Sequence, residues 1–142
     1  MDKDLKRMII LENYQNPKNK QIPTEEGYVK INSNNVSCID NLDIYVKTEN
    51  DIIKDIKYEG EACVICISST SIITNLLIGK TIEEAKDILE NYDNMIEEKP
   101  YNKDILKEAL VYDDIYKQPA RIKCATLSWN GIYQELLKYQ EK

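Results

Sequence analysis

Residues 42–58, LDIYVKTENDIIKDIKY, decide the fold. Apolar and polar side chains alternate along this stretch, and many are β-branched or aromatic, which is typical of half-buried strands. The pattern predicts strands over Leu42–Thr48 and Ile52–Tyr58, joined by a tight turn at Glu49-Asn50-Asp51. Tyr28–Ile31 alternates in the same way. The sequence therefore predicts a three-stranded antiparallel sheet.

Helical patterns lie on both sides of these strands. Apolar residues recur at spacings of three and four, and capping signals mark several ends. The predicted helices cover Asp4–Tyr14, Val64–Ile78 before Gly79, a segment from the Thr81–Glu84 capping box to Tyr92, Tyr101–Leu110, and Ala125–Tyr139. We expect a single α+β domain over residues 1–142, with the helices packed on one face of the sheet.

Composition and charge narrow the class of protein. The chain has 142 residues, 42% of them hydrophobic, and its 19 basic and 25 acidic residues give a formal charge of −6. No basic run suggests a nucleic-acid surface. No stretch has the length of a signal h-region or a membrane span, so we expect a cytoplasmic protein without nucleic-acid or membrane partners.

The cysteines are the main candidates for chemistry. Cys38 falls in the loop between the first two strands, with Asp40 two residues later, and Cys63 and Cys124 each precede a predicted helix. Helix N-termini favour thiolates, and Arg121 and Lys123 flank Cys124 with positive charge. Three thiolates and one carboxylate are a complete ligand set for a tetrahedral metal. Because the chain has no histidine, any metal must be held by sulfur and oxygen.

Simpler interpretations remain for each of these residues. Taken alone, Cys38 and Asp40 are an ordinary loop pair, and Asp40 is also a common turn-former. Arg121 and Lys123 are equally compatible with solvent-facing charges. Cys66 forms a Cys-x-x-Cys with Cys63, which suggests a redox dithiol or another zinc ligand, but a small buried thiol explains it too.

Several motifs resemble those of one family. Cys38-Ile39-Asp40 is similar to a Cys-Gly-Asp signature, and Tyr14–Asn19 is similar to its opening Tyr-x-Asn-Pro-x-Asn. Residues 59–63 (EGEAC) match its second cysteine segment, and residues 119–129 (PARIKCATLSW) match the third. The chain resembles the SufU/IscU family, the NifU amino-terminal-like proteins of iron–sulfur cluster assembly, over nearly its whole length. Lys123, which stands where the IscU branch has histidine, favours the SufU branch.

The resemblance implies a site and an activity. SufU-type proteins hold zinc through residues that correspond to Cys38, Asp40, Cys63 and Cys124, with Arg121 supporting the site. The first of these cysteines accepts persulfide sulfur from a SufS-type cysteine desulfurase for downstream iron–sulfur assembly proteins. Such a protein is a sulfurtransferase-like carrier rather than a turnover enzyme. This chain departs from the family at Ile39, where glycine is usual, which bears on how freely Cys38 can move.

Three functional hypotheses follow from this comparison. The first is a zinc-dependent sulfur carrier, and the second is a scaffold on which a [2Fe–2S] cluster is assembled and passed on. The third is a structural zinc-binding domain without sulfur transfer.

Overall fold

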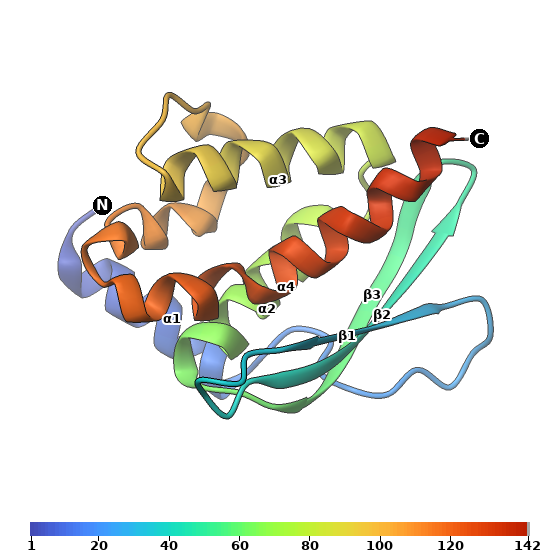
Figure 1. Cartoon of the computed structure of the whole chain (residues 1–142), viewed down its shortest axis with the longest axis horizontal. Coiled ribbons are helices and arrows are strands. Elements are labelled where there is room, and N and C mark those ends of the chain that lie inside the picture. The colour runs from blue at the N-terminus through green and yellow to red at the C-terminus, as the bar shows by residue number, and fades with distance from the viewer. Residues whose placement is uncertain (142) are drawn as a thin grey trace.

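The computed structural model describes residues 1–141, and the side chains of residues 1–139. Its four α-helices and three strands are arranged as two layers (Figure 1). In chain order they are α1 (Lys3–Gln15), β1 (Val29–Asn34), β2 (Asn41–Glu49), β3 (Ile52–Glu61), α2 (Val64–Leu77), α3 (Ile82–Ile96) and α4 (Pro119–Leu137). Four short 3-10 helices, η1 to η4, cover Lys103–Ile105, Lys107–Tyr112, Ile115–Lys117 and Lys138–Glu141.

The sheet is an antiparallel meander in the order β1-β2-β3, as predicted. Asn50 and Asp51 both have positive φ, the geometry of a two-residue hairpin turn whose twist matches that of the strands. The register shifts once in this hairpin. Thr48 pairs with Ile53 and Lys47 with Asp55, so Lys54 is an extra residue in a β-bulge.

The helices cover one face of the sheet, as the alternating pattern predicts (Figure 1). Leu42, Ile44 and Val46 of β2 point into the core, which α2 and α4 close from above. At the centre of the helical layer, Trp129 of α4 stacks on Tyr92 of α3 with ring centroids 3.7 Å apart. This packing fixes α4, which carries one of the candidate cysteines.

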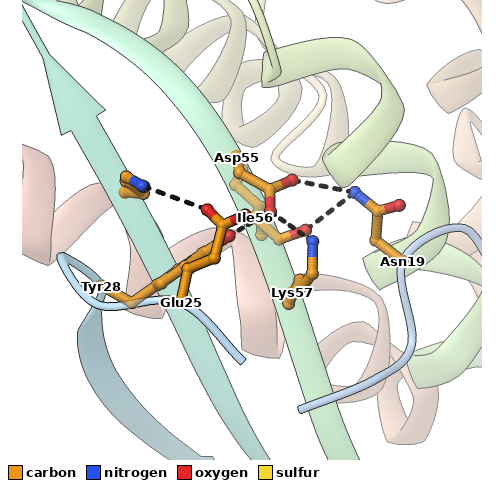
Figure 2. Close-up of polar contacts among 7 residues, drawn as sticks. Asn19, Glu25, Tyr28, Asp55, Ile56 and Lys57 are labelled. Carbon is orange, nitrogen blue, oxygen red and sulfur yellow. Dashed lines mark hydrogen bonds and ion pairs between the residues drawn. The ribbon is translucent and has the colours of Figure 1, made fainter. Parts of the chain in front are cut away.

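The segment between α1 and β1 contacts β3 through its side chains, and Figure 2 shows Asn19, Glu25 and Tyr28 beside Asp55 and Lys57. Asp55 is its anchor, because it accepts hydrogen bonds from the Asn19 amide (3.2 Å) and the Tyr28 hydroxyl (2.5 Å). Lys57 pairs with the same carboxylate at 2.5 Å. Although burial works in the opposite direction, the bonds from Lys57 and Tyr28 hold the pKa of Asp55 below its ordinary value. The anchored segment begins shortly after the end of α1, a helix that packs against α2.

Two predicted helices differ from the structure. Residues 101–110 contain 3-10 turns instead of an α-helix, and the positive φ of Lys107 interrupts the helical path there. The last helix begins at Pro119 rather than Ala125. Proline suits the first helical turn, because no intrahelical partner is needed for its missing N–H. The apolar spacing that we used becomes regular only after Cys124, so it missed the first turn and a half.

Candidate metal centre

Cys38 and Asp40 lie in a tightly folded loop between β1 and β2. The backbone N–H of Cys38 donates to the carbonyl of Asn35 (3.0 Å), and the N–H of Asn35 donates to the carbonyl of Asp40 (2.9 Å). The Asn35 side chain also accepts from the Ser37 N–H at 3.1 Å. Sequence reasoning did not single out Asn35, although asparagine before a turn is a known signal for this type of bond. The loop leaves Cys38 half-buried and buries Asp40.

Cys63 is the N-cap residue of α2, so the prediction that it begins a helix is confirmed. Its backbone N–H donates to Oδ1 of Asp40 at 2.8 Å, and its Sγ lies 3.9 Å from Oδ2 of the same carboxylate. Gly60 makes this approach feasible. It has φ of +136°, and a Cβ there would lie 2.2 Å from the Asn41 carbonyl oxygen, so only glycine fits.

Cys124 lies inside α4, and the prediction that it begins a helix is wrong. Because five helical residues precede it, the positive end of the helix dipole is more than a turn away. Its side chain is 1% exposed. Cys124 is thus a ligand candidate presented by a rigid, packed helix.

The structure brings the four predicted ligands together. One ligand atom each from Cys38, Asp40, Cys63 and Cys124 can be chosen so that all lie within 4.8 Å of one another. Ligand atoms around a tetrahedral zinc are about 3.5–4 Å apart, given Zn–S lengths of roughly 2.3 Å. The three sulfurs and one carboxylate oxygen therefore fit a zinc ion after a small contraction. Three segments that are distant in sequence supply the set.

Burial is the main influence on the pKa values of the thiols in this site. It raises the pKa of Cys124 to about 12, with further contributions from Asp40 and Cys63. Burial also raises the pKa of Cys63, although the Cys66 amide and the Cys124 thiol work against the rise. The expectation that helix termini and basic neighbours lower these pKa values is therefore wrong. A bound cation would instead lower the pKa values of both thiols, since coordinated thiols lose their protons.

Arg121 and Lys123 are both exposed on the first turns of α4. Arg121 precedes Cys124 by three residues and therefore lies on the same side of the helix, one turn earlier. A long side chain there can reach the rim of the site, while Lys123 projects from another side of α4.

Ile39 and Cys66 also have clear positions. Among the described residues, the non-glycine positive φ values do not include Ile39, so its β-branched side chain is unstrained. Ile39 is 64% exposed and lines a hollow with Tyr14, Pro17 and Ala62 beside the metal centre. Cys66 is fully buried in the core and is not part of the four-residue ligand group.

A comparison with protein families gives a clear match over residues 6–142, to the NifU-like N-terminal domain. The chain belongs to this family. Among its relatives, the zinc-dependent sulfurtransferase SufU of Bacillus subtilis is 36% identical over 135 residues, which cover 94% of this chain and 90% of that protein. The iron–sulfur cluster assembly scaffold protein IscU of Thermotoga maritima is 32% identical and covers 88% of each chain.

Solved structures of this NifU-like family support the same fold. A crystal structure from Fervidobacterium islandicum, described as that of a cluster assembly scaffold protein for the SUF system, superposes with a TM-score of 0.80. It is 30% identical and covers 88% of this chain and 94% of the other. The α+β prediction is therefore confirmed. Among the described residues, no helix has the length and apolar character needed to cross a membrane.

Proposed function

We propose that this protein is a zinc-dependent sulfur carrier for iron–sulfur cluster assembly. One observation carries the proposal: Cys38, Asp40, Cys63 and Cys124 present a complete set of zinc ligands, and of the three thiols only that of Cys38 comes from a loop. The 36% identical relative named as a zinc-dependent sulfurtransferase supports it. When bound, zinc would keep the thiols deprotonated without oxidising them, since it has no redox chemistry of its own.

The roles of the four residues follow from how they are held. Cys124 is held in a packed helix, and Cys63 is held by the hydrogen bond that its backbone N–H donates to Asp40. Cys38 is half-buried on an exposed loop whose neighbours Val36 and Ile39 are 96% and 64% exposed. Cys38 is therefore the thiol that can leave the site and meet a donor protein, while the other two remain.

The transfer step is a thiol exchange at Cys38. Its thiolate attacks the outer sulfur of a cysteine persulfide on the donor, and a new S–S bond forms as the donor's own S–S bond breaks. The donor cysteine leaves as a thiolate, and Cys38 becomes the persulfide. We propose a SufS-type cysteine desulfurase as the donor, and we propose that Arg121 at the rim stabilises the negative charge that develops there.

Free thiols throughout the chain suit a reducing compartment. None of its four cysteines forms a disulfide. Thiols remain reduced mainly inside cells, where they are available as metal ligands and sulfur acceptors. We therefore place the carrier in the cytoplasm, together with the downstream iron–sulfur assembly proteins that would receive its sulfur.

Sulfur loading tests the proposal directly. The zinc-bound protein is incubated with a SufS-type desulfurase, its pyridoxal cofactor and cysteine, and trypsin then releases residues 31–47, which contain Cys38 as their single cysteine. We expect this peptide to gain the mass of one sulfur atom. Cys38→Ser should abolish the gain, whereas the matched control Cys66→Ser should retain it. Equal loading of the Cys38→Ser protein would refute the role of Cys38.

Cluster assembly is the second candidate function. The 32% identical scaffold relative favours it, and thiolates are the usual ligands of [2Fe–2S] clusters. Under this alternative, anaerobic incubation with iron and sulfide gives a visible cluster that passes intact to an apo-ferredoxin. A cluster that forms but does not transfer, beside a scaffold that does transfer, would exclude it.

A further inference from the structure

Cys63 and Cys66 lie on the same turn at the start of α2. Cys63 is the N-cap, and its carbonyl already accepts the helical hydrogen bond from the Ile67 N–H at 2.9 Å. Because Val64 and Ile65 are helical, the Cα atoms of the two cysteines are about 5 Å apart. That separation is within the range of disulfides, roughly 4.4–6.8 Å.

Cys66 is in the core behind the metal centre. It is fully buried, and it lies in the first turn of α2, three residues after Cys63. It nevertheless lies outside the four-residue ligand group. When those four residues hold a metal ion, Cys66 is the thiol that stays uncoordinated. Small reagents can therefore reach the half-buried Cys63 sulfur but not the buried Cys66 sulfur.

We propose that Cys63 and Cys66 are a modification site for hydroperoxides, which convert the pair to a disulfide when the metal is absent. The Cys63 thiol gives its proton to the leaving oxygen as its sulfur attacks the outer oxygen of the peroxide, whose O–O bond breaks and releases water or an alcohol. The Cys66 sulfur then attacks the sulfur of the resulting sulfenic acid, so that the S–S bond forms, the S–O bond breaks, and the hydroxyl leaves as water with the Cys66 proton. The pair is oxidised by two electrons, and the peroxide is reduced by two.

Two other thiols lie near Cys63 and compete for it. Cys38 and Cys124 belong to the same group of ligand atoms, but each comes from a different element. A bond to either would move the β1–β2 loop or α4 relative to α2. The bond to Cys66 closes a loop of only two intervening residues within one helix, so it needs the least rearrangement.

Formation of the Cys63–Cys66 disulfide does not depend on the proposed sulfur transfer. Its effect on the protein, however, rests on the proposed zinc binding. Oxidation removes Cys63 from the ligand set and leaves Cys38, Asp40 and Cys124, which do not complete a closed four-ligand site. A bound ion, in turn, occupies the Cys63 sulfur and protects it. The pair therefore makes metal loading dependent on the thiols being reduced.

Peptide mapping tests the pairing without a variant. Chelator-treated protein is exposed to one equivalent of hydrogen peroxide, and the remaining thiols are alkylated before trypsin is added. Residues 58–80 form one peptide that contains both cysteines, while Cys38 and Cys124 fall in residues 31–47 and 124–138. We expect peptide 58–80 to lose two hydrogen atoms and take up no alkyl group, while the other two are alkylated. Cross-linked pairs of these peptides would overturn the proposal.

A second measurement addresses the link to the metal. Zinc-loaded protein given the same peroxide should keep peptide 58–80 fully alkylatable, and oxidised metal-free protein should bind no zinc until dithiothreitol is added. Cys66→Ala is the matched control, which should bind zinc before the treatment and form no disulfide in this peptide. Undiminished zinc binding by the oxidised parent would refute the dependence on reduced thiols, whether or not the protein carries sulfur.

Discussion

Oδ1 of Asp40 accepts a 2.8 Å hydrogen bond from the backbone N–H of Cys63, and this bond joins the β1–β2 loop to the start of α2. Asp40 has two separable roles as a result. One oxygen caps a helix whose own N-cap side chain makes no capping bond, and the other is available to a metal. Asparagine keeps the first acceptor but replaces the second oxygen with an NH₂ group, whereas alanine removes both.

Asp40→Asn and Asp40→Ala should therefore differ in stability but share a defect in zinc binding. We expect alanine to lower the free energy of unfolding of the metal-free protein by about 1–2 kcal/mol, the usual cost of a lost cap, and asparagine by much less. Both should weaken zinc binding by at least tenfold. Urea unfolding and competition with a chromophoric chelator measure the two effects. Equal stability of the two variants would show that the capping bond is unimportant.

Zinc binding should release protons and weaken as the pH falls. Burial raises the pKa of Cys63, and that of Cys124 to about 12, so both thiols are protonated at neutral pH in the metal-free protein. The ion must displace those protons, so the apparent affinity should fall by about tenfold per released proton for each unit of decreasing pH. Chelator competition between about pH 6.5 and pH 8 gives the slope. A pH-independent affinity would contradict this account.

Asp93 on α3 should destabilise the protein at neutral pH. Burial, together with Glu97 and Glu90, raises its pKa from 3.8 to about 6. The folded state therefore holds a proton that the unfolded state has lost, and stability decreases as the pH rises through this window. We expect Asp93→Asn to add about 1 kcal/mol to the free energy of unfolding at pH 7.5, after allowance for partial exposure, and nothing below about pH 4.

Thermal unfolding of the Asp93→Asn protein at several pH values checks this expectation. Asp87→Asn is the control, because Asp87 is an exposed carboxylate on the same helix. A gain of similar size at Asp87, or a gain at Asp93 that does not change with pH, would point to general charge repulsion in this acidic chain.

Two glycines allow backbone strain to be separated from steric overlap. Gly60 and Gly79 both have positive φ, but a Cβ would collide with the Asn41 carbonyl at Gly60 and meets nothing within 4 Å at Gly79. We expect Gly79→Ala to cost about 1 kcal/mol, from its backbone alone. Gly60→Ala should cost about 2–4 kcal/mol and impair zinc binding as well, because the overlap separates β2 from β3 next to Cys63. Similar losses in both variants would exclude the steric explanation.

The sheet was predictable because its signal is local. Alternation along β2 and β3 depends only on which side chains must be buried, and the turn at Asn50 and Asp51 has residues that tolerate positive φ. The start of α4 was not predictable from apolar spacing. Its first turn is exposed at Arg121 and Lys123, so Pro119 was the only signal there.

The motifs predicted which residues lie together in the candidate site, but not the hydrogen bond between them or their pKa values. The motifs around Cys38, Cys63 and Cys124 indicated which residues would meet, and the structure brings their ligand atoms together. The bond from Cys63 to Asp40 depends on the register that sets Asn41 opposite Glu61, across the end of a long hairpin. The pKa values depend on how deeply each thiol is buried, which is a property of the packed protein rather than of the motif.

The bulge at Lys54 determines where the chain can change its length. Because Lys54 is the extra residue between two paired positions, its removal would leave every side chain from Asp55 to Cys63 facing as it does now. If one residue between Asp55 and Tyr58 were lost instead, the side chains that remain between Lys54 and the deletion would point to the wrong face of the sheet. Natural insertions and deletions in this hairpin should therefore cluster at position 54, far along the strand from the metal ligands that they would otherwise displace.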